Sequence, residues 1–181
     1  PKQGWIAVRL VAGVIGGSDV AYFNGHRAPK PLPLESGRPL RECVGRVVAT
    51  SSKHFREGDA VVAKPHSHRG LREVFLAREQ DAIVIPANMP VEWATLVQPL
   101  ASVLYGLEQL GHVEGASVTI AGAGPVGLLA AWSLERLGAG PIRVLDPVRE
   151  RLYWAKRYGA DETLPLTTVQ TASLIRSRAF K

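Results

Sequence analysis

The sequence predicts an α/β protein in which a β-rich N-terminal part is followed by a doubly wound parallel sheet. Two observations lead to this fold class. Short runs of β-branched and apolar residues, separated by Gly, Pro and Ser, fill residues 5–85, which is typical of an all-β domain. From Ser117 onward, strand-length apolar runs alternate with helical periodicity, which is typical of a parallel sheet. With 181 residues, the chain has room for one ordinary domain or two small ones.

The β-rich part is expected over residues 1–90. Its candidate strands are "WIAVRLVA", "CVGRVVAT", "DAVVAKP", "EVFLA" and "AIVIP". Several short strands of this kind favour a barrel-like sheet. The stretch "NGHRAPKPLPLESGRP" between the first two runs holds four prolines, and we expect it to be a loop.

Connecting helices are expected over residues 91–115. From Val91 the apolar residues recur at helical spacing, and Gly111 is placed to end the run. Pro99 lies inside it. Because proline lacks an amide donor and crowds the preceding turn, we expect a kink or two helices that meet there.

Residues 116–181 are expected to form the parallel sheet. The pattern predicts strands at 118–121 and 141–145, helices at 125–137 and 148–158, and a third strand in "ETLPL". The end, "TTVQTASLIRSRAFK", is interpreted as one more helix or a frayed terminus. A complete dinucleotide-binding sheet has about six strands, so this part supplies roughly half of one.

The turn "AGAGPVG" after the first of these strands carries three glycines at G-x-G-x-x-G spacing. In such a turn Gly122 permits the tight bend, Gly124 lets the main chain approach a pyrophosphate, and Gly127 lets the helix pack close to the strand. Pro125 and Val126 open the helix, whose unpaired N–H groups favour an anion. The turn therefore predicts a nucleotide-binding site.

Asp146 ends the second predicted strand, about 20 residues after the glycines, where such sites place an acid on the ribose. Its carboxylate would accept hydrogen bonds from both ribose hydroxyls and repel a 2′-phosphate, which favours NAD over NADP. Arg149 and Arg151 weaken this preference because a guanidinium tolerates the extra phosphate. Asp146 is also compatible with a role as N-cap of the following helix.

The net charge, the length of the apolar runs and the cysteine count limit the partners and the compartment that we expect. The formal charge of +6 admits a nucleic-acid surface, but the basic residues alternate with acids at helical spacing, and a solvated face is the preferred interpretation. We expect no nucleic-acid and no membrane partner, since no apolar run approaches a membrane span. Cys43 is the single cysteine. It excludes an internal disulfide framework and a thiolate zinc cluster, and it favours the cytoplasm.

The order of several motifs resembles the medium-chain dehydrogenase/reductase superfamily, and within it the zinc-dependent polyol and alcohol dehydrogenases. The motifs are "AGVIGGSDV", "ECVGRVVA", "FREGDAVVA", "LVQPLASVLYGLEQL", "GASVTIAGAGPVGLLAAWSLERLGA" and "VRERLYWAKRYGADE". The resemblance implies a GroES-like β-rich catalytic domain, followed by the first half of a Rossmann domain that binds NAD(P). It also implies a chain cut at both ends, a small-molecule substrate, and a homodimer at full length.

Three positions depart from the zinc-dependent relatives. Where those carry a cysteine ligand, a histidine ligand and an acid near the metal, this chain has Gly16, Arg41 and Gln98. None of these residues binds zinc well, and the four-cysteine lobe of the structural zinc is missing as well. We therefore expect no metal. His66 and His68 form an H-x-H pair, for which an ordinary exposed loop is preferred to a metal role.

The resemblance assigns roles to residues that remain. Ser18 matches a hydroxyl that relays a proton from the substrate, Asp19 and Glu42 match acids around the metal, and Ser102 matches a small hydroxyl residue that faces the nicotinamide. A histidine that often continues the relay is replaced by Ala21. For "GGSD", a turn that caps the next helix is an equally good interpretation.

Without a metal, another group must stabilise the oxyanion that forms as hydride moves. Arg41 is the candidate, with Ser18 as a second donor, although Arg41 could instead pair with Glu42 and only fill space. The expected function is therefore zinc-independent, NAD(P)-dependent hydride transfer to or from a small alcohol or carbonyl compound. The alternatives are a catalytically inactive nucleotide-binding homologue and a scaffold segment of a larger polypeptide.

Overall fold

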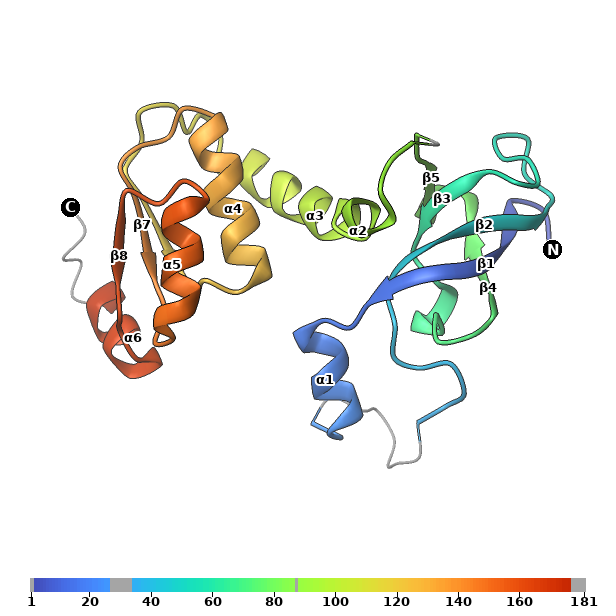
Figure 1. The fold of residues 1–181 in the computed structure, drawn as a ribbon, viewed down its shortest axis with the longest axis horizontal. Coiled ribbons are helices and arrows are strands. Elements are labelled where there is room, and N and C mark those ends of the chain that lie inside the picture. The colour runs from blue at the N-terminus through green and yellow to red at the C-terminus, as the bar shows by residue number, and fades with distance from the viewer. Residues whose placement is uncertain (1, 27–33, 87, 177–181) are drawn as a thin grey trace. The chain divides into compact units, whose positions relative to one another are not determined.

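The computed structural model describes residues 2–26, 34–86 and 88–176, shown in Figure 1. The chain divides into two compact units, Pro1–Gln98 and Pro99–Lys181, and each is described by itself. The proline-rich loop is without helix or strand over residues 34–38, and its residues 27–33 lie outside the described part. Among the described residues, no helix combines the length and apolarity that crossing a membrane requires.

The first unit is built on a five-stranded antiparallel sheet. Its strands are β1 (Trp5–Val14), β2 (Glu42–Thr50), β3 (Ala60–Ala63), β4 (Val74–Arg78) and β5 (Ala82–Val84). They pair in the order β4-β1-β2-β3-β5. All five predicted strands are present. Short helices α1 (Gly17–Phe23), η1 (His66–His68) and η2 (Glu79–Asp81) connect them.

The sheet of the first unit curls around an apolar core. Ile6, Val8 and Val61 are fully buried on its inner face, as strand alternation places them. The pairing of β1 with β2 shifts register twice, between Ala7 and Val8 and again after Leu10, and such bulges bend a strand. Gly45 faces β1 so closely that a Cβ there would lie 2.3 Å from the Arg9 carbonyl oxygen.

Two helices follow the sheet, as expected, but their junction differs from the prediction. Helix α2 covers Val91–Ala94 and α3 covers Val97–Glu108, so that they meet at Thr95–Leu96 and not at Pro99. Pro99 lies in the first turn of α3, where its missing N–H has no intrahelical partner to lose. The boundary between the two units falls within α3.

The second unit is a three-stranded parallel sheet in the order β6-β7-β8, with β6 at Val118–Ala121, β7 at Ile142–Leu145 and β8 at Glu162–Leu164. Helices α4 (Pro125–Arg136) and α5 (Arg149–Arg157) lie side by side on one face of it (Figure 1), and α6 covers Thr168–Arg176. The core combines β6, β7, α4 and α5 with one face of α3 and includes Val103, Leu107, Leu134, Ile142, Val144, Leu152 and Ala155. The predicted alternation of strand and helix is confirmed.

Candidate functional site

The glycine turn joins β6 to α4 in the second unit. Gly122 has a φ of +109°, a conformation that side chains other than glycine rarely adopt. A Cβ at Gly127 would lie 1.8 Å from the Gly122 carbonyl oxygen, so that only glycine permits this approach of helix and turn. The roles that the sequence assigns to these two glycines agree with this geometry.

The outer side of the turn is open. A Cβ at Gly124 would meet nothing within 4 Å, and Gly124 is the N-cap of α4 without a side-chain capping bond. Pro125 occupies the first position of the helix, and Val126 is 62% exposed. The outer side of the first turn of α4 is therefore open at Gly124 and Val126, and the unpaired N–H groups of a helix N-terminus favour an anion such as a pyrophosphate.

Asp146 closes the turn from the end of β7. It is 4% exposed, and its Oδ2 accepts a hydrogen bond from the Ala123 N–H at 2.8 Å. Its Oδ1 accepts another from the Val148 N–H at 2.8 Å. The N-cap of α5 is Val148, so the alternative of Asp146 as N-cap is wrong. Arg151 lies nearby, with its Nη1 3.8 Å from Asp146 Oδ2.

The first unit holds a small polar pocket beside α1. It is lined by Asp19, Tyr22, Arg38, Pro39, Arg41 and His68. Asp19 is 1% exposed, and its Oδ2 accepts a hydrogen bond from the Gly16 N–H at 2.9 Å, so the capping interpretation of "GGSD" holds for Asp19. Its other oxygen, Oδ1, is buried with no hydrogen-bond partner among the described residues. Asp19 therefore caps α1 and still presents a charged oxygen to the pocket.

Arg41 faces that oxygen. Its Nε is 3.9 Å from Asp19 Oδ1, which makes an ion pair beyond hydrogen-bond length. Within the described ranges this is the one ion pair of Arg41, so its partner is Asp19 and not the expected Glu42. About 30% of the Arg41 side chain is exposed. The guanidinium thus adds a fixed positive charge to the pocket.

Glu42 and Cys43 lie behind the pocket at the start of β2. Burial and the nearby Asp19 carboxylate raise the pKa of Glu42, while Arg41 opposes the shift. Glu42 Oε2 is buried and lacks a hydrogen-bond partner in the described part of the chain. Burial, with Glu42 and Asp19 close by, raises the pKa of Cys43 to about 12. This thiol is therefore protonated and inert at neutral pH.

The pocket contains four residues that the sequence did not single out as site residues, namely Tyr22, Arg38, Pro39 and His68. His68 enters it because its carbonyl oxygen accepts a hydrogen bond of 3.2 Å from the Leu40 N–H, next to Arg41. His66 instead packs edge-on against Trp5 at 4.9 Å. The H-x-H pair lies in the short turn η1, in which Ser67 and His68 have positive φ values, and its two rings have different surroundings. In the sequence, the one indication of this pocket is that Arg38 lies close to Arg41 in "RPLRE".

The remaining predicted residues are distributed over both units. Ser18 lies half-buried in the first turn of α1. Gln98 and Ser102 belong to α3, and Ser102 is exposed. Among the described residues, no three His, Cys, Asp or Glu side chains come together as a metal site requires. The donors at the family's metal positions do not fit zinc either, because glycine has no donor and a guanidinium stays protonated.

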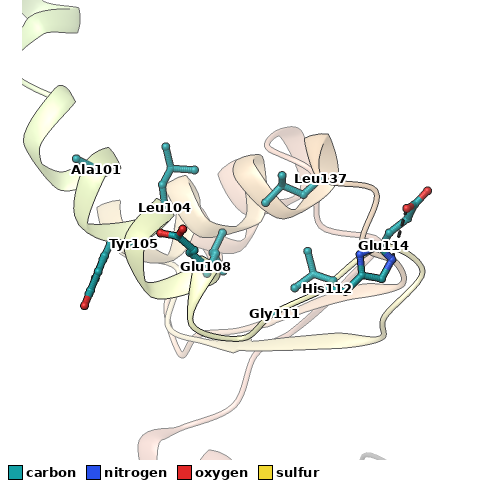
Figure 2. Close-up of a pocket in the computed structure, with 10 residues that line it drawn as sticks. Ala101, Leu104, Tyr105, Glu108, Gly111, His112, Glu114 and Leu137 are labelled. Carbon is teal, nitrogen blue, oxygen red and sulfur yellow. Dashed lines mark ion pairs between the residues drawn. The ribbon is translucent and has the colours of Figure 1, made fainter.

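A groove in the second unit lies away from the glycine turn. It measures about 680 Å³ and is lined by the end of α3, the segment that follows it, and Leu137 after α4. Figure 2 shows its apolar side chains and the exposed ion pair of His112 with Glu114, whose atoms are 3.6 Å apart. Leu137 is at the opposite end of α4 from Gly124, about 20 Å along the helix axis. None of the predicted site residues lines this groove.

Comparison with known proteins agrees with this arrangement. Residues 2–87 match the family of the alcohol dehydrogenase GroES-like domain. A probable D-xylulose reductase A of Neosartorya fischeri is 31% identical over 140 residues, which are 77% of this chain and 38% of the relative. Sorbitol dehydrogenase of Bacillus subtilis is 28% identical over 189 residues, covering 86% of this chain and 52% of the relative.

A solved structure is similar over both units. The quinone oxidoreductase of Pseudomonas syringae pv. Tomato DC3000 aligns with a TM-score of 0.81 and 26% identity, covering 100% of this chain and 57% of that protein. The chain thus spans between about two fifths and three fifths of the length of these proteins.

Proposed function

Because the chain belongs to the medium-chain dehydrogenase/reductase superfamily, we propose that it takes part in NAD(P)-dependent hydride transfer to or from a small alcohol or carbonyl compound, without catalytic zinc. The relatives named above are dehydrogenases, reductases or oxidoreductases, which supports an oxidoreductase role. The observation that carries the proposal is the open glycine turn of the second unit, held by Asp146.

The second unit would bind the dinucleotide. The amides after Gly122 and the first turn of α4 would hold the pyrophosphate. Each Asp146 oxygen accepts one backbone hydrogen bond and keeps a lone pair for a ribose hydroxyl. The buried negative charge would repel a 2′-phosphate, which supports NAD over NADP, although Arg151 at 3.8 Å moderates this repulsion. When bound, the nicotinamide supplies or accepts the hydride.

The first unit would hold the substrate oxygen. We propose that Arg41 and Ser18 donate hydrogen bonds to it, and that Asp19 orients Arg41 through their ion pair. During oxidation the substrate carbon loses a hydride, and its hydroxyl proton moves to Ser18 Oγ as the Ser18 hydroxyl releases its own proton to solvent. The Arg41 charge stabilises the alkoxide before the carbonyl forms. Glu42, beneath the pocket, would keep the local charge balanced.

Zinc independence is supported by Gly16, Arg41 and Gln98. They stand where zinc-dependent relatives have residues at the metal, and they bind zinc poorly. No step above needs a metal, because the guanidinium supplies the positive charge to the oxyanion. Zinc independence is tested directly, because every assay is run after chelation and again with added Zn²⁺.

A second candidate is a homologue that binds nucleotide or serves as a scaffold without turnover. The observation that favours it is the Asp19–Arg41 ion pair, because an arginine already engaged by a carboxylate fills space without catalysis. The three metal positions have also changed together while the glycine turn is retained.

The experiment that separates these functions follows NADH oxidation with a panel of aldehydes, ketones and quinones. Metal-free turnover supports the proposed reaction. Tight NADH binding without oxidation favours the inactive homologue, and turnover that appears only with Zn²⁺ overturns zinc independence. We also propose a cytoplasmic protein that forms a homodimer at full length and has no nucleic-acid or membrane partner. Cys43, the single cysteine, is buried and free, which supports a reducing compartment.

A further inference from the structure

We propose that a groove between α5 and β8 (Figure 1) binds a small molecule with a phosphate group at each end, of the size of a hexose bisphosphate. The groove measures about 360 Å³ and is lined by Arg149, Leu152, Tyr153, Lys156, Thr163 and Pro165. None of these residues belongs to the glycine turn or lines the pocket beside α1. The inference therefore does not rest on the proposed function.

One face of α5 forms a wall of this groove. Leu152, Tyr153 and Lys156 follow Arg149 by three, four and seven residues, and these spacings place all four side chains on the same side of a helix. Leu152 is 6% exposed and gives the wall an apolar centre, whereas both cationic residues are exposed. Arg149 and Lys156 lie about 10 Å apart along the helix axis. The groove therefore has a positive charge at each end.

Both cations keep donors for a ligand. Lys156 Nζ donates a hydrogen bond to the Asp161 carbonyl oxygen just before β8, which uses one of the three N–H donors of the ammonium group. In the described part of the chain, the Arg149 guanidinium has neither a hydrogen bond nor an ion pair. Tyr153 Oη accepts a hydrogen bond of 3.1 Å from Arg157 Nη1, so the Tyr153 hydroxyl proton stays available as well.

The nearby carboxylates do not line the groove. Glu162 Oε2 accepts a hydrogen bond of 2.6 Å from Arg143 Nε, and Asp161 Oδ2 accepts one of 2.7 Å from the Ile142 N–H. Both acids are thus engaged by β7. Glu150 lies about 100° round the helix from Arg149. No acid is found among the described residues that line the groove, so an anion there meets two cations and no lining carboxylate that repels it.

Phosphate groups suit these two ends better than carboxylates do. At neutral pH a phosphate monoester carries a charge of about −1.5 to −2, and in an open groove that salt and water screen, the larger charge keeps the stronger attraction. Arginine binds phosphate through its planar fork, and lysine binds it as a point charge. Tyr153 and Thr163 add hydroxyl-bearing side chains to the lining, which can bond to the hydroxyl groups of a sugar.

The test compares fructose 1,6-bisphosphate with fructose 6-phosphate, and with D-glucarate, which has a carboxylate at each end. Calorimetric titrations of the whole chain at low ionic strength give the three dissociation constants without any cofactor. We expect the bisphosphate to bind about fivefold more tightly than either of the others, because one further charge pair at an exposed site has an effect of this size. Lys156→Gln and Arg149→Gln should each bring the bisphosphate and monophosphate constants together.

Arg136→Gln is the matched control, because it removes the same charge from α4 of the same unit. Arg136 makes its hydrogen bonds to Trp132 and Glu135, and it does not line the groove. This variant should keep the wild-type ratio of the bisphosphate and monophosphate constants. A fall of the ratio equal to that in Lys156→Gln would assign the preference to net charge and overturn the inference.

Three other results would count against the site. Equal binding of bisphosphate and monophosphate by the wild type, or an unchanged ratio in Lys156→Gln and Arg149→Gln, would overturn the inference. Glucarate that binds as tightly as the bisphosphate would overturn the assignment to phosphate. Gly124→Ala should leave the bisphosphate affinity unchanged, and loss of binding in this variant would place the anion at the glycine turn instead of the groove.

Discussion

The Asp146 carboxylate accepts a hydrogen bond of 2.8 Å from the Ala123 N–H, so the end of β7 holds the glycine turn that follows β6. The same carboxylate binds the Val148 N–H ahead of α5. One buried side chain thereby fixes the strand end, the turn and the entry to the next helix. The contribution of Asp146 to the free energy of unfolding and its contribution to nucleotide affinity can be measured separately.

Asp146→Asn should lower both the free energy of unfolding and the affinity for NAD. An asparagine offers one acceptor oxygen, and its NH₂ group would face a backbone donor, which costs about 1–3 kcal/mol at a buried site. Denaturant unfolding and an NADH fluorescence titration measure the two effects. Asp161→Asn is the control, because Asp161 Oδ2 accepts the Ile142 N–H at 2.7 Å elsewhere in the sheet. It should destabilise the fold and leave the affinity unchanged, and equal affinity losses in both variants would contradict a special role for Asp146.

Gly127→Ala should lower the stability of the fold, whereas Gly124→Ala should lower the affinity for NADH and leave the stability unchanged. The Gly127 Cβ would lie 1.8 Å from the Gly122 carbonyl oxygen, so this variant should lose at least about 2 kcal/mol of stability through overpacking. The Gly124 Cβ meets nothing within 4 Å, so that variant should fold normally. We expect it to bind NADH at least about tenfold more weakly, because the methyl group occupies the space for the pyrophosphate. Normal NADH affinity in Gly124→Ala would argue against a dinucleotide at this turn.

Periodicity and turn chemistry were enough to predict the strands and the glycine turn. The β6–α4–β7–α5–β8 alternation follows from local pattern, since each apolar run is bounded by Gly or Pro. The α2–α3 junction was misplaced because Pro99 is tolerated in a first turn. Proline disrupts the interior of a helix but not its first turn. The effect of Pro99 therefore could not be predicted without knowing where α3 begins.

The pocket beside α1 depends on contacts that sequence distance hides. Arg41 is a predicted site residue. Its ion pair with Asp19 depends on how the fold places α1 relative to the start of β2. His68 joins only because the chain after β3 returns to pair with Leu40. Such long-range pairings are set by tertiary packing, and neither spacing nor composition encodes them locally.

Cys43 should react slowly with thiol reagents in the folded chain. Burial raises its pKa to about 12, and the thiolate is the reactive form. We expect labelling by a disulfide reagent at pH 8 to be at least about 100-fold slower than in guanidinium chloride. Fast labelling of the folded protein would show that the start of β2 opens readily and that the pocket above it is not rigid.

Glu42→Gln should stabilise the fold more at pH 8 than at pH 4.5. The folded-state pKa of Glu42 is raised by burial and by Asp19, so the folded protein holds this proton more tightly than the unfolded chain. Stability therefore falls as the pH rises from the unfolded-state pKa through the raised folded-state pKa. The amide removes this penalty. The measurement is the difference in unfolding free energy between variant and wild type at both pH values, with the exposed Glu57→Gln as control, and a difference that grows on acidification would contradict the shift.

The triple variant Gly16→Cys/Arg41→His/Gln98→Glu should gain stoichiometric Zn²⁺ binding that the wild type lacks. A Cβ at Gly16 would lie 3.6 Å from Asp19 Oδ2 and 3.8 Å from Ser18 Oγ, which are ordinary contact distances for the first side-chain atom of a cysteine. The histidine would lie near Asp19, and a carboxylate beside an imidazole raises its basicity as a ligand. Removing the guanidinium also removes the charge that opposes a cation. Metal content after dialysis measures binding, and Arg41→His alone is the control, since one ligand is too few for a zinc site. Stoichiometric zinc in the wild type would disprove zinc independence and assign the positive charge of this pocket to the metal.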